Sequence, residues 1–255
     1  MSAWEILALD AAVLGGLMVA LWLVSLKLRD ASIVDPFWGT GFVIVAWTAA
    51  LAGDLSGWGL VLALLTTAWG LRLSLHLARR NLGHGEDFRY QAMRKRYPRF
   101  ELTSLVIVFG LQGLLLWIVA LPLQLAPAFD GSGHLLGVLG VGVWTVGLAF
   151  EAVGDAQLSR FRADPANEGR VLDTGLWRYT RHPNYFGDAT VWWGLWLVAV
   201  AAGAPWWTAV GPVVMTVLLR RVSGVTLLER SLAQRRPGYE DYVRRTSPFV
   251  PRPPR

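Results

Sequence analysis

The sequence contains no cysteine and few charged residues. Without cysteine, the 255-residue chain forms no disulfide, has no thiolate nucleophile and binds no metal through cysteine. Charged residues make up only 16% of the chain, against about 25% in soluble domains. Because 54% of the residues are hydrophobic, too few polar side chains remain to cover the surface of a water-soluble fold. These shortages predict a membrane-embedded protein.

The hydrophobic residues come in blocks of about 20, the length that a helix needs to cross a bilayer. We therefore expect an all-α, polytopic membrane protein with about seven transmembrane helices. A single domain is expected over 1–255, with a short flexible tail rich in proline and arginine at 248–255. The expected spans are 4–26, 33–52, 57–78, 104–124, 133–154, 186–203 and 205–222.

The positions of Lys and Arg predict the orientation of the chain. These residues gather in the first, third and fifth connections and in the C-terminal segment, whereas the alternate connections, near Asp54, Asp130 and Ala204, contain none. By the positive-inside rule, the N-terminus is expected outside and the C-terminus in the cytoplasm. The net charge is +6, and membrane insertion by itself accounts for a basic surface on one side. We therefore expect membrane lipids, and not nucleic acid, as partners of the basic face.

A polar cluster begins inside the fifth expected span with Glu151 and Asp155, one helical turn apart. Acids within a span usually face a partner or a water-filled cavity. The run from Gly175 to Asp188 follows, with arginines, a histidine and an asparagine suited to binding phosphate or carboxylate. The cluster predicts a pocket for a phosphorylated or carboxylated cofactor within 151–245. The alternative is a belt of aromatic and basic side chains that anchors the chain at the headgroups.

Three motifs together resemble a known family. They are Gly175-Leu-Trp-Arg-Tyr-Thr-Arg-His-Pro-Asn-Tyr-Phe-Gly-Asp188, the upstream Glu151-x3-Asp155, and Trp69-Gly-Leu-Arg72 with Gly85-Glu-Asp-Phe-Arg-Tyr90. The combination resembles the steroid 5-alpha-reductase superfamily, most closely its bacterial branch of membrane proteins. The resemblance implies seven helices and an NADPH site in a cytoplasmic-side cavity. It also implies reduction of a carbon–carbon double bond conjugated to a carbonyl, in a lipid-soluble substrate at the bacterial inner membrane.

The resemblance carries cofactor contacts over to particular positions. Arg72 and His76 lie on a helix that ends in the cytoplasm and are expected to meet the cofactor, with a packed histidine or a helix-end anchor as the alternative. In the second half, the implied residues are Glu151, Asp155, Arg162, Arg170, Asn184 and Asp188, with Tyr179, Arg181 and His182 as neighbours.

The sequence departs from the family at the catalytic end. The animal enzymes use a Gln–Glu motif in the second helix and a tyrosine in the third to bind the substrate carbonyl, and this sequence has neither. Asp35, just inside the second expected span, is the nearest replacement for the acid, and Tyr90 is the other candidate donor. Both are named as candidate catalytic residues. The alternative for Asp35, which precedes Pro36, is a helix cap.

A second enzyme class shares part of this pattern. The isoprenylcysteine and phospholipid methyltransferases, which use S-adenosylmethionine, also carry Arg-His-Pro-x-Tyr-x-Gly before a membrane hairpin, as in 181–187 here. The acids at 151 and 155 and the segment around Asp35 favour the reductases. The main prediction is therefore an NADPH-dependent oxidoreductase that needs no metal. The sequence predicts neither the substrate nor the oligomeric state.

Overall fold

The structure is a computed structural model that describes residues 1–53, 55, 57–81, 83, 85–222 and 238–254. These residues form helices and turns, and their only extended pairing is an isolated bridge between Thr180 and Ser247. The sequence predicts a single domain, and the chain divides into two compact units. Unit 1 is Met1–Gly137 with Val198–Val210, and unit 2 is Val138–Leu197 with Gly211–Arg255. Each unit is described by itself.

Five of the described helices are long and apolar enough to cross a membrane. Large apolar side chains remain exposed on them, such as Leu135 at 74% and Val106 at 70%. Such exposure is unfavourable in water and favourable in lipid, so these helices indicate a multi-pass integral membrane protein. The five candidate spans are Ala3–Leu28, Ala31–Ala52, Gly57–Asn81, Phe100–Val119 and His134–Ala163.

The last two expected spans have a different form. The span expected at 186–203 corresponds to α9, Pro183–Ala201, and the one at 205–222 is divided into short helical segments. Neither segment is among the five candidate spans. The described part of the chain therefore supports an all-helical membrane protein with five candidate spans.

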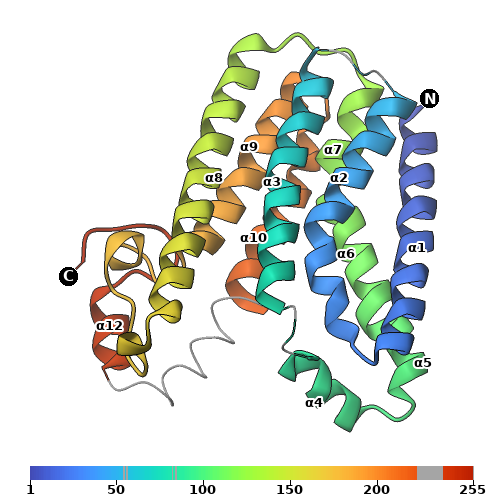
Figure 1. The fold of residues 1–255 in the computed structure, drawn as a ribbon. Coiled ribbons are helices and arrows are strands. Elements are labelled where there is room, and N and C mark those ends of the chain that lie inside the picture. The colour runs from blue at the N-terminus through green and yellow to red at the C-terminus, as the bar shows by residue number, and fades with distance from the viewer. Residues whose placement is uncertain (54, 56, 82, 84, 223–237, 255) are drawn as a thin grey trace. The chain divides into compact units, whose positions relative to one another are not determined.

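Unit 1 contains the first four candidate spans and the connections between them (Figure 1). Local signals fix several helix ends. Ser2 and Glu5 form a capping box at the start of α1, Asp30 caps η1, and Asp87 caps α4. Pro122 stands near the start of α7, where the missing N–H costs no hydrogen bond. The elements are α1 (Ala3–Leu28), η1 (Ala31–Ile33), α2 (Val34–Ala52), α3 (Gly57–Asn81), α4 (Phe88–Arg96), α5 (Phe100–Ser104), η2 (Leu105–Gly110), α6 (Leu111–Val119), α7 (Leu121–Leu125), η3 (Ala126–Ala128) and η6 (Trp206–Ala209).

Two glycines bring α2 and α3 into backbone contact. A Cβ added at Gly39 would overlap the carbonyl of Gly70, and one added at Gly70 would lie 2.6 Å from the carbonyl oxygen of Gly39. Beside them, the hydroxyl of Thr40 donates to Ser74 Oγ at 2.8 Å. Small residues at a crossing allow helices to pack closely in lipid, where burial of apolar surface gives little driving force. This contact sets the position of α2.

Unit 2 is built on a similar contact between α8 (His134–Ala163, from residue 138) and α9 (up to residue 197). A Cβ at Gly187 would overlap the backbone of Glu151, and one at Gly194 would overlap that of Trp144. The spacing of these glycines, seven residues, keeps them on one face of α9. The unit also contains η4 (Pro165–Asn167), η5 (Gly175–Arg178), α10 (Val210–Val217), η7 (Leu218–Val222) and α12 (Tyr239–Arg245).

The C-terminal residues of unit 2 contact the segment before α9. The hydroxyl of Thr180 donates to the carbonyl of Phe249 at 2.8 Å, and the backbone N–H of Arg252 donates to the carbonyl of Tyr179 at 3.0 Å. Tyr242 of α12 donates to the carbonyl of Trp177 at 2.5 Å. The tail for which the sequence predicts a flexible end is thus hydrogen-bonded through residues 249 and 252.

The glycine contact between α2 and α3 yields a stability prediction. Gly39→Ala is expected to lower the melting temperature in detergent, because its Cβ has no space against Gly70, an effect of about 1–3 kcal/mol for overpacking. The matched control is Gly16→Ala on α1, where a Cβ meets nothing within 4 Å. This control should keep or raise the melting temperature, because alanine favours helix. Equal melting temperatures for the two variants would contradict the close contact.

Candidate functional site

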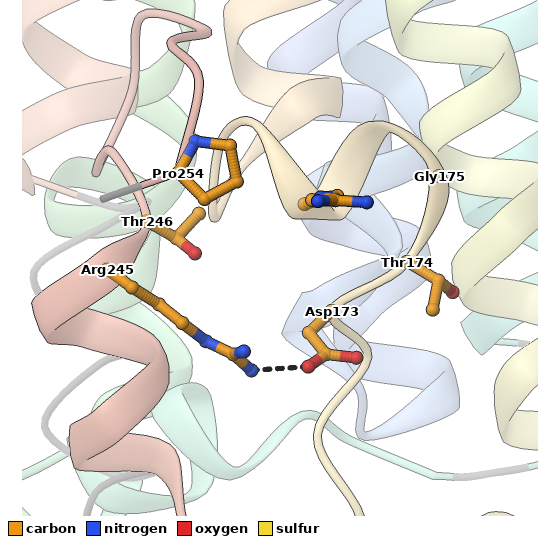
Figure 2. A pocket seen from close by; sticks show the side chains of 7 residues that line it. Asp173, Thr174, Gly175, Arg245, Thr246 and Pro254 are labelled. Carbon is orange, nitrogen blue, oxygen red and sulfur yellow. Dashed lines mark hydrogen bonds and ion pairs between the residues drawn. The ribbon is translucent and has the colours of Figure 1, made fainter.

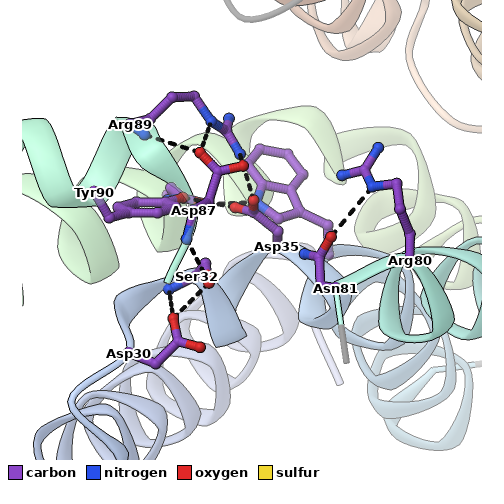
Figure 3. A network of polar contacts seen from close by, with 10 residues as sticks. Asp30, Ser32, Asp35, Arg80, Asn81, Asp87, Arg89 and Tyr90 are labelled. Atoms are coloured by element: carbon purple, nitrogen blue, oxygen red, sulfur yellow. Dashed lines mark hydrogen bonds and ion pairs between the residues drawn. The ribbon is translucent and has the colours of Figure 1, made fainter. Parts of the chain in front are cut away.

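The two candidate catalytic residues are hydrogen-bonded to each other in unit 1. The hydroxyl of Tyr90 in α4 donates to Asp35 Oδ1 in α2 at 2.6 Å, and Arg89 Nη2 donates to Asp35 Oδ2 at 2.5 Å (Figure 3). Tyr90 is 5% exposed, and the side chain of Asp35 is 13% exposed. Both carboxylate oxygens of Asp35 therefore act as acceptors in a largely buried site.

Asp35 does not cap its helix, which was the alternative prediction for this residue. The residue before α2 is Ile33, which makes no side-chain capping bond, and the capping aspartate in this region is Asp30 of η1. Asp35 lies in the first turn of α2, and its oxygens are used by α4. Its contacts thus differ from those of a structural cap, and its catalytic role remains a prediction.

A glutamine that the sequence analysis did not single out completes this set. Gln112 Nε2 in α6 donates to the hydroxyl oxygen of Tyr90 at 3.1 Å, while the indole N–H of Trp38 donates to Gln112 Oε1 at 2.6 Å. Because an indole N–H can only donate, it fixes the amide with its oxygen toward Trp38 and its NH₂ toward Tyr90. The phenol therefore accepts from Gln112 and directs its own proton to Asp35.

The surroundings of Tyr90 keep it protonated. Burial raises the pKa of the Tyr90 hydroxyl far above its ordinary value, and the negative charge of Asp35 adds to this rise. The guanidinium of Arg89, which lies 5.4 Å from the ring centre, and the bond from Gln112 act in the opposite direction and are weaker. Tyr90 is thus a neutral donor near pH 7 and is chemically able to hydrogen-bond a carbonyl oxygen. We call Asp35, Tyr90 and Gln112 the carbonyl cluster.

Arg89 joins the carbonyl cluster to the start of α4. Its Nε donates to Asp87 Oδ1 at 2.9 Å, and the same oxygen accepts from the backbone N–H of Arg89. Burial disfavours the ionised form of Asp87, but the bonds from Arg89 outweigh this and lower the pKa of Asp87. The guanidinium is therefore shared between two carboxylates, Asp35 and Asp87.

A second ion pair holds the connection between α3 and α4 against η1. Arg94 binds Glu86 through two nitrogens, Nη2 to Oε1 at 2.9 Å and Nε to Oε2 at 3.1 Å. The backbone N–H of Ala31 also donates to Glu86 Oε1 at 2.9 Å. Burial opposes ionisation of Glu86, but the bonds from Arg94 and Ala31 outweigh it and lower the pKa of Glu86. Glu86 thus holds α4 in the position from which the Tyr90 hydroxyl contacts Asp35.

The polar residues that were not predicted from the sequence share one signal there. Gln112, Gln124 and Asp10 are polar residues inside long apolar runs, and such residues are costly in a membrane unless they have a function or a partner. Asp10 and Gln124 are completely buried, and neither oxygen of Asp10 has a hydrogen-bond partner among the described residues. Only Gln112 of the three joins the carbonyl cluster.

Arg72 and His76 are the remaining site predictions in unit 1. They lie one helical turn apart on α3, following the buried Trp69, and both are half-buried. Their predicted role in cofactor binding stays a prediction.

In unit 2, the structure brings three of the predicted polar residues together. Glu151 and Asp155 are buried on consecutive turns of α8, and Asn184 Nδ2 at the start of α9 donates to Asp155 Oδ1 at 3.0 Å. The approach depends on glycine, because a Cβ at Gly154 would lie 3.1 Å from the backbone nitrogen of Asn184. Asp188, half-buried, lies one turn further along α9. The buried acids and the amide can accept from or donate to hydroxyl and carboxamide groups.

The neighbours predicted at 179–182 have contacts of their own. Arg181 is buried, and its Nη1 donates to the carbonyls of Val243 at 2.8 Å and Thr246 at 2.9 Å, at the end of α12. The ring of His182, also buried, stacks on Tyr185 with 5.5 Å between centroids. These contacts give Arg181 an architectural role at the C-terminal segment, which the sequence did not predict.

The predicted phosphate-binding residues lie on the surface of unit 2. Arg162 at the end of α8 and Arg170 in the following loop are exposed, and Tyr179 is 44% exposed. Guanidinium groups bind phosphate oxygens in pairs, so the types of these side chains suit a phosphorylated cofactor.

Comparison with known proteins places the chain in a family. A family described as "Protein of unknown function (DUF1295)" matches residues 21–246, a range that includes every predicted site residue. The chain belongs to this family. A similar protein is the uncharacterized protein C594.04c of Schizosaccharomyces pombe, 24% identical over 264 residues that cover 91% of this chain and 76% of the relative. No solved structure matches the chain.

The ion pair of Glu86 predicts a pH dependence that this member of the DUF1295 family should show. Because the pKa of Glu86 is lowered on folding, its contribution to stability is present above the unfolded-state value, about 4.3. It is lost as the pH falls through the lower pKa of the folded protein. Glu86→Gln should therefore lower the melting temperature near neutral pH, and the difference from wild type should shrink on acidification.

The control for this measurement is Glu168→Gln, because Glu168 is exposed and its side chain makes no hydrogen bond or ion pair with a described residue. Its melting temperature should follow the wild type at every pH. A Glu86→Gln variant that also follows the wild type would contradict a role of this ion pair in holding α4.

Proposed function

We propose that the chain is a membrane-embedded, NADPH-dependent reductase of a carbon–carbon double bond conjugated to a carbonyl in a lipid-soluble substrate. The observation that carries the proposal is the carbonyl cluster. The resemblance to steroid 5-alpha-reductases implies an acid, a glutamine and a tyrosine around the substrate carbonyl, and the DUF1295 family is associated with such proteins. In this chain the same three chemical types meet from α2, α4 and α6.

The cluster fits the charge that such a reaction develops. When bound, NADPH supplies the hydride that adds to the electrophilic carbon of the enone. Negative charge then grows on the carbonyl oxygen, and a preorganised donor aimed at that oxygen lowers the barrier. Tyr90 is the proposed donor, because its hydroxyl is neutral and held by two partners. A phenol has a single proton, so this proton would turn from Asp35 to the carbonyl oxygen when the substrate binds, while Gln112 continues to donate to the phenol oxygen. Asp35, which accepts from Arg89 and Tyr90, is assigned the role of positioning Tyr90 before the substrate binds.

The cofactor is assigned to the polar residues that the resemblance implies. In unit 2, the buried Glu151, Asp155 and Asn184 suit ribose hydroxyls and a carboxamide, and the exposed Arg162 and Arg170 suit phosphates. The resemblance also implies cofactor contacts for Arg72 and His76, an assignment that rests on the sequence. A catalytic metal has no part in this chemistry.

The main competing function is an S-adenosylmethionine-dependent methyltransferase. It rests on the Arg-His-Pro-x-Tyr motif, in which His182 stacks on Tyr185. The carbonyl cluster favours the reductase, because methyl transfer neutralises charge on the sulfur and develops no oxyanion that needs a phenol donor.

The proposal includes an orientation in the bacterial inner membrane. It has seven spans, with α9 and the segment from η6 to η7 as the last two, the N-terminus outside and the active site on the cytoplasmic side. The support is the one-sided distribution of Lys and Arg along the sequence.

The cofactor can be identified by its effect on the melting temperature. NADPH is expected to stabilise the detergent-purified protein, by about 2.7 kcal/mol at a hundred times its Kd, and S-adenosylmethionine is not. Arg162→Ala or Arg170→Ala should weaken NADPH binding by roughly tenfold to a hundredfold, since a hydrogen bond to a charged group is worth about 1.5–3 kcal/mol. Arg160→Ala, another exposed arginine of α8, is the matched control and should bind normally. Stabilisation by S-adenosylmethionine alone would favour the methyltransferase.

The donor can be identified by kinetics. Tyr90→Phe removes the proposed hydrogen bond and should reduce turnover of a lipid-soluble enone by roughly 10²-fold, the scale for losing an oxyanion donor, with NADPH affinity unchanged. Asp35→Asn should also lower turnover, because an amide has one acceptor oxygen and cannot accept from both Arg89 and Tyr90, which leaves Tyr90 poorly positioned. The measurement is NADPH oxidation, with kcat and KM determined separately.

Tyr97→Phe is the control for these variants, because Tyr97 follows the same helix α4 and its hydroxyl makes no hydrogen bond with a described residue. It should keep full turnover. Normal turnover in both Tyr90→Phe and Asp35→Asn would remove the carbonyl cluster from the mechanism.

A further inference from the structure

Unit 2 contains a hollow that no predicted site residue lines. Its volume is about 570 Å³, and its walls include Asp173, Thr174 and Arg178 from the segment before α9, with Arg245, Thr246 and Pro254 from the C-terminal segment. Figure 2 shows the side chains of Arg245 and Asp173 pointing toward one another across it, where they form an ion pair. This volume is in the range of small-molecule sites, about 300–1,000 Å³.

A second hollow adjoins the first, since Arg245 and Thr246 line both. Its volume is about 230 Å³, and the described residues that line it include Arg181, Arg244 and Arg252 but no acid. Among the described residues, five arginines and a single acid, Asp173, line the two hollows. The charge therefore favours an anion.

The walls are held by hydrogen bonds and are not loose surface segments. The buried Arg181 donates to the carbonyls of Val243 and Thr246, and its backbone N–H donates to the carbonyl of Ser247 at 2.9 Å. Tyr242 and Thr180 add the bonds to Trp177 and Phe249 described above. A binding site whose supporting groups are fixed loses less entropy when a ligand binds.

Three of the lining arginines have N–H donors that no described residue uses. Arg178 and Arg252 are exposed, and neither side chain makes a hydrogen bond or ion pair with a described residue. Arg245 uses Nη2 for Asp173 and has four further N–H donors. The hydroxyls of Thr174 and Thr246 add neutral donors to the same walls.

We propose that the two hollows form a binding site for a phosphate group, with Arg178, Arg245 and Arg252 as its charged ligands. Planar guanidinium groups bind phosphate oxygens in pairs, which is the geometry that several arginines and hydroxyls around one cavity offer. The larger hollow has room for the group that the phosphate carries. The phosphate is either that of a lipid headgroup or that of a soluble phosphorylated compound. Phosphate binding at this site does not require NADPH, and the site goes beyond the proposed reductase activity.

The test uses the full chain in phosphatidylcholine nanodiscs without NADPH. One arm adds inorganic pyrophosphate at constant ionic strength, set with sodium chloride, and the other replaces part of the phosphatidylcholine with phosphatidic acid. A rise in melting temperature is expected in at least one arm. A response to pyrophosphate identifies a soluble source, and a response to phosphatidic acid alone identifies a lipid headgroup.

The variant for this test is Arg178→Gln with Arg252→Gln, which removes two charges without breaking a contact between described residues. It should raise the half-saturating amount of the active probe by about tenfold or more, as expected for losing charged hydrogen bonds. Arg221→Gln, an exposed arginine of η7 outside both hollows, removes a charge from the same unit and should respond like the wild type.

If the double variant melts at a lower temperature without any probe, Arg252→Gln alone takes its place and should still lose affinity. The proposal is overturned if neither probe raises the melting temperature of the wild type. It is also overturned if Arg221→Gln loses as much affinity as the hollow variants, because the effect would then be one of total charge.

Discussion

The candidate catalytic chemistry depends on one carboxylate, that of Asp35, which accepts from both Arg89 and Tyr90. A charged or strongly polar group at the edge of a bilayer is costly unless it is paired. Every member of this network is paired with another. Arg89 forms ion pairs with both Asp35 and Asp87, and the Tyr90 hydroxyl donates to Asp35 and accepts from Gln112. The pairing therefore fixes the short helix α4 against the start of α2 and holds a neutral phenol at a defined position.

Close contact between helices brings polar side chains on neighbouring helices within hydrogen-bonding distance. In lipid, packing and hydrogen bonds replace the hydrophobic driving force, so small residues decide how near two helices lie. In unit 1, Gly39 and Gly70 bring α2 onto α3, and in unit 2, Gly187 brings α9 onto α8 beside Glu151. The hydrogen bond between Asn184 and Asp155 is possible only because the helices lie this close.

The second half of the chain uses its polar residues for two tasks. Arg181, Thr180 and Trp177 all contact the C-terminal segment, so part of the most polar stretch in the sequence serves architecture. Arg178, in the same stretch, has a side chain with no bond to a described residue and lines a hollow. Residue type alone does not separate these tasks, because a guanidinium suits a backbone carbonyl and a phosphate equally.

The sequence by itself determined the helical, membrane-embedded character of the chain, because hydropathy over a helix length is a local property and the bilayer admits few backbone structures. It also supplied Asp35, Tyr90, Asp155 and Asn184 as separate candidates. Only the tertiary structure decided which of them meet, since Asp35 and Tyr90 are 55 residues apart and their contact runs through α4, a short polar helix with no hydrophobic signal. Gln112 became visible in the same way, because its role follows from the orientation that Trp38 imposes on its amide. The division of the arginines between architecture and binding likewise came from contacts more than 60 residues apart, such as that between Arg181 and Val243, which no local pattern encodes.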